Sequence, residues 1–293
     1  MGLRGEIMDK YSVFLKVAEA GSFTKAAQDL GYTQSAVSQI VLSLEKELFS
    51  SLLLRDRKGV TLTSEGKDLL PYIRNISNSH RQLAEKANDL HGLKDGTVRI
   101  GTYSSMSCHV LPPLMKNFGS KYPEIKFELL QGDYDATENW IKTGRVDFGL
   151  LPPKAFPDLE ITVLKKDRMM AVLPPGHHLS KRKTIPLSEL AKESYIHLEE
   201  GSFSEPFQAF DELGVFPHIR FRVHDDYTIM SMVESGLGVS VLSELVLNRT
   251  SYNIEIRETD PPVIRTIGIA CKSRRALSAA NNEFINYIMK EIK

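Results

Sequence analysis

Residues 17–39 read VAEAGSFTKAAQDLGYTQSAVSQ, and this stretch decides how the N-terminal part of the chain folds. Ser22 and Thr33 each stand directly before an apolar run with helical spacing, where a hydroxyl can cap the first turn of a helix. Gly21 and Gly31 follow the preceding runs, as glycine does at helix ends. The stretch therefore predicts a helix that ends near Gly21, a short second helix, and a third helix that begins after Thr33.

The second and third predicted helices have the features of a helix-turn-helix. Ala26 and Ala27 are small enough to let the two helices pack closely. The third helix leaves a polar, uncharged surface that consists of Gln34, Ser35, Ser38 and Gln39. In a helix-turn-helix, the second of the two helices enters the major groove of DNA, where short amide and hydroxyl side chains reach base edges and phosphates. On periodicity alone, a plain helical core with a solvated polar face fits these residues equally well.

A predicted hairpin follows the three helices. Residues 52–54 are three leucines, and residues 55–63 read RDRKGVTLT, which is a basic tip with a glycine and then a β-branched return strand. This pattern is typical of a β-wing whose positive charges bind phosphates. The wing favours the DNA-binding interpretation over the plain helical core.

Residues 64–93 predict one long helix with an apolar seam. Apolar or seam positions recur in steps of four and three, at Leu69, Ile73, Ile76, His80, Leu83, Ala87 and Leu90. That spacing is typical of a two-stranded coiled coil and implies a partner helix, and the helix would reach about 42 Å. Pro71 is expected to kink or open its early turns. The alternative is a helix that packs against its own chain.

The chain from residue 97 onward alternates predicted strands and helices. The strands are expected at 98–101, 125–130, 146–151, 169–173, 195–198, 219–223, 239–242 and 264–270, with helices at 110–121, 135–143, 205–213 and 228–235. Repeated strand–helix–strand units predict a mostly parallel sheet. Open sheets of this kind bind ligands beyond the carboxyl ends of their strands.

Composition limits the class of protein. The chain has 293 residues, 42% hydrophobic and 25% charged, with 37 basic and 37 acidic side chains, so it predicts an ordinary globular protein of about two domains. The charge balance by itself predicts no nucleic-acid partner. No apolar stretch is long enough to span a membrane, and the first residues lack the apolar core of a secretory signal. We therefore expect a cytoplasmic protein with no membrane partner.

The N-terminal sequence resembles the LysR-type transcriptional regulators. The matching residues are Phe14, VAEAGSFTKAAQDL at 17–30, TQSAVSQ at 33–39, Ile40, Leu44, Glu45, Leu48 and RDRKGVTLTSEG at 55–66. Two positions depart from the family pattern, since Phe49 replaces a turn-forming Gly and Leu53 replaces a Phe. The turn into the wing is therefore expected to be built differently.

The resemblance implies an α/β protein in three parts. An all-α winged helix-turn-helix domain occupies residues 1–66, and a linker and dimerisation helix with a hinge occupies residues 67–96. A two-lobed α/β domain like the type 2 periplasmic binding proteins occupies residues 97–293 and binds an effector. Its first lobe comprises 97–165 and 268–293, and its second lobe comprises 166–267.

The resemblance also implies the DNA target and the assembly. A homodimer, and in this family usually a tetramer of two dimers, would bind double-stranded operator DNA with dyad symmetry. The expected DNA-contacting residues are Ser22, Thr24, Thr33, Gln34, Ser35, Ser38 and Gln39, with Arg55, Arg57 and Lys58 on phosphates. No cofactor is expected.

Residues 102–108, TYSSMSC, suggest where an effector binds. Hydroxyls and free backbone N–H groups at a helix start can bind an anion without Lys or Arg, so an organic acid with a carboxylate is the expected effector. Ordinary helix capping is the alternative. The resemblance implies that Ser105 contacts the acid group and that other strand ends contribute. The expected effector-binding residues are Thr102, Ser104, Ser105, Asp133, Tyr134, Ser202, Phe203, Tyr227 and Thr228.

Other candidate sites are weaker. Cys108 at a helix start could act in redox sensing, but Cys108 and Cys271 form no close pair, so buried, inert thiols are expected. His177 and His178 lie in a Pro-Gly loop where no third ligand is expected nearby, so a surface turn is expected and no metal site. The rival interpretation is a two-lobed enzyme or solute-binding receptor with a helical dimerisation arm. Because no catalytic triad or phosphate loop is present, we predict that the chain is not an enzyme.

Overall fold

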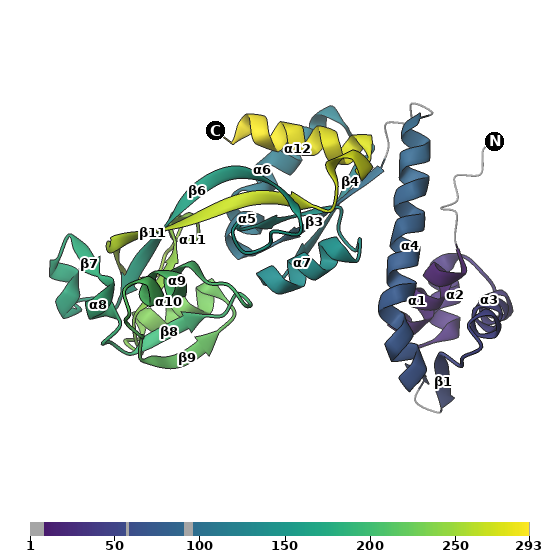
Figure 1. The fold of residues 1–293 in the computed structure, drawn as a ribbon, viewed down its shortest axis with the longest axis horizontal. Helices are drawn as coiled ribbons and strands as arrows, with labels where there is room; N and C mark the ends of the chain where they lie inside the picture. Colours follow the sequence, from purple (N-terminus) through teal and green to yellow (C-terminus); the bar gives the residue numbers. More distant parts are fainter. Residues whose placement is uncertain (1–8, 57–58, 91–95, 293) are drawn as a thin grey trace. The chain divides into compact units, whose positions relative to one another are not determined.

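The computed structural model describes residues 9–56, 59–90 and 96–292. The chain divides into two compact units, one built mainly from its first 93 residues and the other from residues 94–293 (Figure 1). Within the described residues, no helix is both long enough and apolar enough to cross a membrane.

The first unit begins with the three predicted short helices, α1 (Lys10–Ala20), α2 (Phe23–Leu30) and α3 (Gln34–Glu47). The Ser22 hydroxyl accepts a hydrogen bond from Lys25 N at 3.3 Å, and the Thr33 hydroxyl accepts one from Ala36 N at 3.2 Å. Gly21 and Gly31 end α1 and α2 in the left-handed conformation. The predicted end of α1, both ends of α2 and the start of α3 are therefore confirmed, because the caps that define them form.

We call the part of this unit that comprises α1–α3 and the wing the head, and its core lies between the three helices. Phe14, Ala26, Val37 and Leu44 are fully buried, and Ala27 is almost so. The wing consists of β1 (Leu53–Asp56) and β2 (Gly59–Leu62), which pair antiparallel. Val60 N donates a hydrogen bond to Gly21 O at 2.9 Å, so the wing is joined to the end of α1. A side chain at Gly59 would come within 2.8 Å of the same carbonyl, which explains the glycine there.

The long helix α4 (Ser64–Leu90) packs on the head through its first turns (Figure 1). Ile73 is fully buried in the head core, with Leu69 partly buried beside it. The expected opening at Pro71 is not seen in the secondary structure, because the helix continues through this residue. Gly66 allows the first turn to approach the wing, since a Cβ there would lie 2.2 Å from Leu52 O.

The second unit has two lobes with separate cores. The first lobe contains β3 (Gly96–Thr102), β4 (Ile125–Gln131), β5 (Phe148–Leu151), α5 (Ser104–His109), α6 (Leu111–Lys121), α7 (Tyr134–Lys142) and α12 (Ala279–Glu291). The second contains β7 (Thr184–Pro186), β8 (Tyr195–Leu198), β9 (Ile219–Val223), β10 (Ser240–Ser243), α8 (Leu187–Leu190), α9 (Glu205–Glu212), α10 (Asp226–Glu234) and α11 (Glu244–Leu247). Short 3₁₀ turns lie at His178–Lys181 and Arg274–Ala276.

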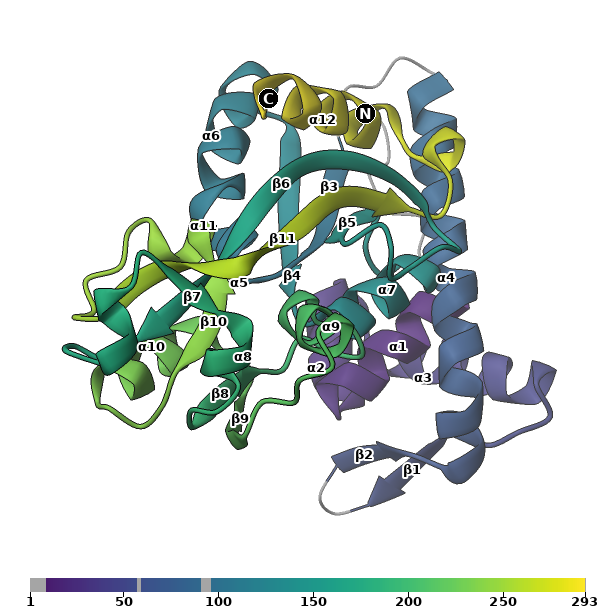
Figure 2. The ribbon, with the colours of Figure 1, turned by 60° about the vertical axis from the view of Figure 1, so that its left-hand side comes forward.

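Two long strands, β6 (Glu160–Leu173) and β11 (Glu255–Cys271), connect the lobes. They run side by side and in opposite directions (Figure 2), with Lys165 opposite Ile267. Within the described residues, the main sheet has seven strands. Their order is β10-β6-β11-β5-β3-β4, and β7 pairs with β11.

The prediction of a mostly parallel sheet is wrong for the strands around β6 and β11. β6 pairs antiparallel with β10 and β11, and β11 pairs antiparallel with β5. The pairs β3–β4, β3–β5, β7–β11 and β8–β9 are parallel as predicted. The reason is that the chain leaves the first lobe on one long strand and returns on its neighbour, which must run in the opposite direction. Both strands are also longer than predicted. The prediction followed only their apolar segments, whereas each strand continues through exposed positions that carry charged residues.

Candidate functional site

The head presents a polar face along α3. Val37, Val41 and Leu44 turn inward, so the opposite side of the helix faces solvent. Exposed on that side are Thr33, Gln34, Ser35 and Gln39, with Ser38 half-buried beside them. Thr24 is exposed on α2, and Ser22 is half-buried as the α2 cap. Hydrogen-bonding side chains are thus gathered at the start of a helix that is itself held rigidly by the head core.

Arg55, at the end of β1, is held against this face rather than extended into solvent. Its guanidinium carbon lies 3.8 Å from the centre of the Phe23 ring, and its Nη2 donates to Ser38 Oγ at 2.9 Å. The stacking and the hydrogen bond fix the charge next to α3. Arg57 and Lys58, the other predicted phosphate contacts, lie outside the described residues.

The turn into the wing shows how the two departures from the family pattern are accommodated. Phe49 occupies the left-handed region with φ 51°, and its side chain is 96% exposed. The Glu45 carboxylate accepts hydrogen bonds from Leu52 N at 2.7 Å and Leu53 N at 3.2 Å, which anchors the chain after the turn. Leu53 itself is buried in the head core.

The predicted seam of α4 divides into two groups. Ile73 and Leu69 pack into the head, and His80 Nδ1 lies 3.1 Å from Asp9 Oδ2, so these residues have partners within their own chain. Ile76, Leu83 and Ala87 are exposed, and Tyr72 extends the same exposed row. The side chain of Leu90 lies outside the described part of the structure. The exposed apolar row on α4 therefore comprises Tyr72, Ile76, Leu83 and Ala87.

In the second unit, the loop that follows β3 lies at the boundary between the lobes. Thr102 and Ser105 are buried, whereas Ser104 is half-buried. Ser105 Oγ accepts a hydrogen bond from Arg265 Nη2 at 2.9 Å, and Ser104 Oγ accepts one from Gln131 Nε2 at 3.2 Å. The two predicted hydroxyls are present at this boundary, and each already has a partner.

Sequence reasoning missed the buried charge at the centre of the boundary. Arg265 on β11 is 2% exposed, and its Nη2 lies 2.6 Å from Asp167 Oδ2 and 2.7 Å from Ser243 Oγ. Its guanidinium carbon lies 4.9 Å from the centre of the Tyr103 ring. The signal was available, since strand alternation places Arg265 on the same buried face as Val263, Ile267 and Ile269. A charge on such a face needs a partner, and Asp167 supplies it.

Three further carboxyl groups of the second lobe lie near enough to feel the charge of Arg265. Glu205 and Asp226 are each 6% exposed, and Glu200 is half-buried. Burial raises the pKa of all three, that of Glu200 to about 8, although the Arg265 charge opposes the increase. We call the group the inter-lobe cluster: it consists of Tyr103, Ser105, Tyr134, Asp167, Glu200, Glu205, Asp226 and Arg265.

Several polar atoms of the inter-lobe cluster have no hydrogen-bond partner in the described residues. They are both carboxylate oxygens of Glu205, the hydroxyl of Tyr134 and Nε of Arg265. A buried polar atom without a partner is costly, typically by about 1–3 kcal/mol. Such atoms are therefore candidates for contacts with a bound molecule.

The other predicted effector residues differ in their roles. Tyr134 N donates to Glu200 O at 3.1 Å, Ser202 Oγ donates to Asp135 Oδ1 at 2.6 Å, and the Tyr227 hydroxyl lies 3.1 Å from His109 Nε2. These contacts bridge the lobes. Asp133 caps α7 by accepting from Ala136 N, Thr228 is exposed and bonded to Asp225, and Phe203 packs on the first-lobe core. Capping therefore accounts for Asp133 and Thr228.

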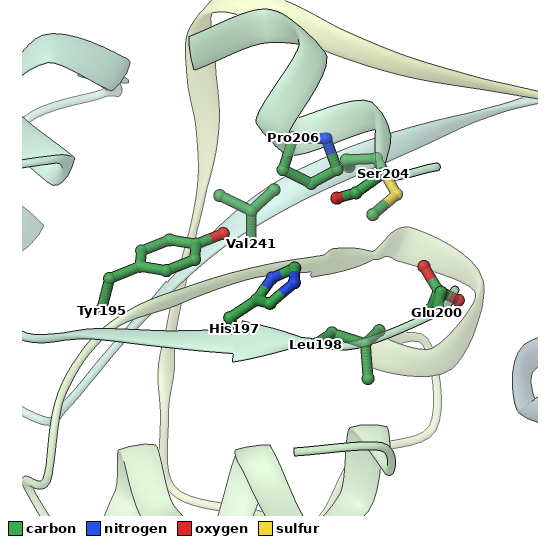
Figure 3. Close-up of a pocket in the computed structure, with 8 residues that line it drawn as sticks. Tyr195, His197, Leu198, Glu200, Ser204, Pro206 and Val241 are labelled. Carbon is green, nitrogen blue, oxygen red and sulfur yellow. The ribbon is translucent and has the colours of Figure 1, made fainter. Parts of the chain in front are cut away.

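A hollow of about 200 Å³, counting space open to solvent, adjoins the cluster on the second lobe. Figure 3 shows Tyr195, His197 and Glu200 along one wall, with Ser204 and Pro206 of the α9 start facing them. Glu200 lies at one end, so the hollow leads toward the inter-lobe cluster.

Two earlier expectations need correction. Cys108 is exposed rather than buried, while Cys271 is buried and its pKa is raised to about 11 by that burial. His177 and His178 do have a third potential ligand nearby, because the Glu193 carboxylate lies 3.6 and 3.5 Å from their Nε2 atoms. However, His177 Nδ1 accepts a hydrogen bond from Leu179 N, which in a neutral ring places the proton on Nε2 and removes that lone pair from metal binding.

Comparison with known proteins supports both units. The family described as "Bacterial regulatory helix-turn-helix protein, lysR family" matches residues 8–67, and the family described as "LysR substrate binding domain" matches residues 91–293. The uncharacterized HTH-type transcriptional regulator YvbU of Bacillus subtilis is 36% identical over 279 residues, which cover 93% of this chain and 94% of YvbU.

Two solved structures share the fold. A full-length OxyR variant from Pseudomonas aeruginosa has a TM-score of 0.72 at 21% identity and covers 97% of this chain and 96% of its own. CbnR, a LysR family regulator solved with its target DNA, has a TM-score of 0.67 at 19% identity and covers 97% of each chain.

The winged helix-turn-helix head and the two-lobed unit together define a DNA-binding regulator with an effector-binding domain. The chain belongs to the LysR family of bacterial transcriptional regulators. Its family consists of regulators rather than enzymes, so the rival interpretation of a two-lobed enzyme or receptor with a helical arm is set aside.

Proposed function

We propose that this regulator binds dyad operator DNA in the cytoplasm with two copies of α3, one in each half-site. The exposed polar row of Thr33, Gln34, Ser35 and Gln39 supports this role, because these side chains lie on a helix whose other face is locked in the head core. Base edges would be read from this row, and Arg55 would contact a phosphate beside it. Ser22, Thr24 and Ser38 would border the same contact, with Arg57 and Lys58 at the wing tip.

We propose that α4 forms the dimer. Its exposed apolar row is the observation that carries this proposal, since an isolated helix would gain nothing from holding Tyr72, Ile76 and Leu83 in water. The head would then comprise residues 1–66, the dimer helix and hinge 67–96, and the effector domain 97–293. Two dimers would form a tetramer, as is usual in the family.

We propose that a small metabolite with a carboxylate binds at the inter-lobe cluster and changes the spacing of the two heads. Support comes from the unpartnered Arg265 Nε and Tyr134 hydroxyl, which can both donate to an acid group, and from Ser105 beside them. A ligand bound between two lobes stabilises one arrangement of the lobes over another, and this shifts the population of DNA-bound states.

An electrophoretic mobility assay on the DNA upstream of the gene, at two salt concentrations, tests the DNA-binding role. Specific binding that weakens with salt is the expected result, because phosphate contacts release counterions. Absence of specific binding at low salt would remove the proposal. Ser105→Val tests the effector site: it should abolish the response of DNA binding to the small-molecule fraction of the source cells. An unchanged response would show that Ser105 has no part in effector binding.

A further inference from the structure

The unpartnered atoms of the inter-lobe cluster are of two kinds. Arg265 Nε can only donate a hydrogen bond, and the Tyr134 hydroxyl can donate one. Both oxygens of Glu205 can accept, and a carboxylate cannot donate at all when it is ionised. A ligand that satisfies all of these atoms must therefore bring acceptors to Arg265 and N–H or O–H donors to Glu205.

The charges of the inter-lobe cluster point the same way. Arg265 is already paired with Asp167 in a buried salt bridge. Glu200, Glu205 and Asp226 then remain as three further carboxyl groups around a single cation, with Asp133 adding to the potential at Glu200. An organic acid alone would increase this negative excess, whereas a cationic group would balance part of it.

The pKa values agree with this geometry. Burial and neighbouring carboxylates raise the pKa of Glu200 to about 8, and burial raises the pKa of Glu205 and Asp226. Burial therefore favours the protonated form of these groups over the ionised form, although the Arg265 charge opposes this. A positive ligand would supply the missing charge.

We propose that the effector is a small zwitterion with the chemistry of a free amino acid, whose cationic nitrogen binds Glu205 and whose carboxylate binds Arg265 Nε and the Tyr134 hydroxyl. This proposal rests on the proposed function, in which a metabolite binds between the lobes. Glu200 also lines the hollow on the second lobe, which lies next to the proposed site (Figure 3).

Thermal unfolding of the full-length chain with three matched sets of compounds tests the inference. The sets are the standard amino acids, their deaminated acids and their decarboxylated amines. At least one amino acid should raise the melting temperature, while its matched acid and its matched amine should bind roughly ten- to a hundredfold more weakly, because each lacks one charged contact.

Glu205→Gln then tests the cationic contact. This variant should weaken binding of that amino acid roughly tenfold or more, while the deaminated acid should bind no more weakly than to the wild type, because one negative charge has been removed. Glu212→Gln on the same helix is the matched control, since Glu212 is exposed, and it should change neither. Circular dichroism and sedimentation of each variant separate a lost contact from a lost fold.

Several outcomes would overturn the inference. They are equal binding by the acid and the amino acid, binding by amines alone, binding by no compound of the three sets, and an amino-acid affinity that Glu205→Gln leaves unchanged. Adding the small-molecule fraction of the source cells to the DNA-binding assay distinguishes a failure of the zwitterion inference from a failure of the proposed function. If that fraction alters DNA binding while the amino acids do not bind, the proposed function stands and the zwitterion inference falls. If the fraction also has no effect, both fall.

Discussion

Arg265 on β11 and Asp167 on β6 stand directly opposite each other on neighbouring strands, with 2.6 Å between Arg265 Nη2 and Asp167 Oδ2. Both side chains are almost completely buried. The pair therefore joins the two long strands that connect the lobes, at the place where the unpartnered polar atoms gather.

Removing the negative partner should be costly. Asp167→Asn leaves a buried guanidinium with no carboxylate in its salt bridge, and breaking a buried pair in this way typically costs about 3–5 kcal/mol. We expect a corresponding loss of stability in urea unfolding of the full-length chain. Lys165→Gln on the same strand is a control, because the Lys165 side chain has no buried partner among the contacts described. A loss below about 1 kcal/mol for Asp167→Asn would show that Arg265 finds compensation elsewhere.

Gln34 and Arg55 should differ in their effects on DNA binding. Gln34→Ala should relax sequence preference at one operator position by about 1–3 kcal/mol, because an amide that reads a base edge is removed. Arg55→Ala should weaken binding to all sequences and reduce the salt slope by about one, because a phosphate contact is removed. Binding titrations on operator and mutated operator at several salt concentrations measure both. The same loss on every DNA for both variants would contradict this division of roles.

Phe49→Gly should stabilise the head. Phe49 holds φ 51°, a conformation that costs a residue with a Cβ roughly 1–2 kcal/mol, and its exposed ring contributes little packing to offset that cost. After the greater chain entropy of glycine is subtracted, a gain of about 0.5–1 kcal/mol is expected in thermal or urea unfolding. Phe49→Ala is the control, because it removes the ring and keeps the strained backbone. Equal stability of the two variants would exclude the backbone explanation.

Leu83→Glu should weaken the dimer without destabilising the protomer. Leu83 is 68% exposed in the single chain, so the substitution removes no contact there, but in a paired helix it would bury a charge. Sedimentation should show at least a tenfold rise in the concentration at which half the chains are monomeric. Asn88→Glu is the matched control, because Asn88 is also exposed and lies about 140° around the helix from Leu83. A dimer that is unaffected by Leu83→Glu would remove α4 as the interface.

Glu200 should make the ligand-free protein less stable as the pH rises. Its pKa is raised to about 8 by burial, with Asp226, Glu205 and Asp133 adding to the increase and Arg265 opposing it. A carboxyl group with a raised pKa in the folded state contributes most below its unfolded pKa of about 4.5, and that contribution is lost as the pH rises to about 8. Urea unfolding of wild type and Glu200→Gln between pH 5 and 8.5 should show wild type losing stability relative to the variant. A difference that is constant over this range would contradict a raised pKa.

Local patterns determined much of the head from sequence alone. Gly21, Ser22, Gly31 and Thr33 set the end of α1, both ends of α2 and the start of α3, because capping and the left-handed turn depend on residues only three or four positions apart. The exposed polar side of α3 follows from its helical period in the same way. The repeated strands and helices of the second unit were also predicted, although their lengths were not.

The tertiary structure alone decided which residues meet at the boundary between the lobes. Arg265 lies 98 residues from Asp167 and 160 residues from Ser105 along the chain, so no local pattern could pair them. The same holds for Ile73, which follows the seam spacing of α4 but is buried in its own head. Periodicity specifies which side of a strand or helix is apolar or polar, whereas the partner of that side depends on how distant segments pack. At Glu205, this packing leaves a buried carboxylate without a hydrogen-bond partner in the described residues.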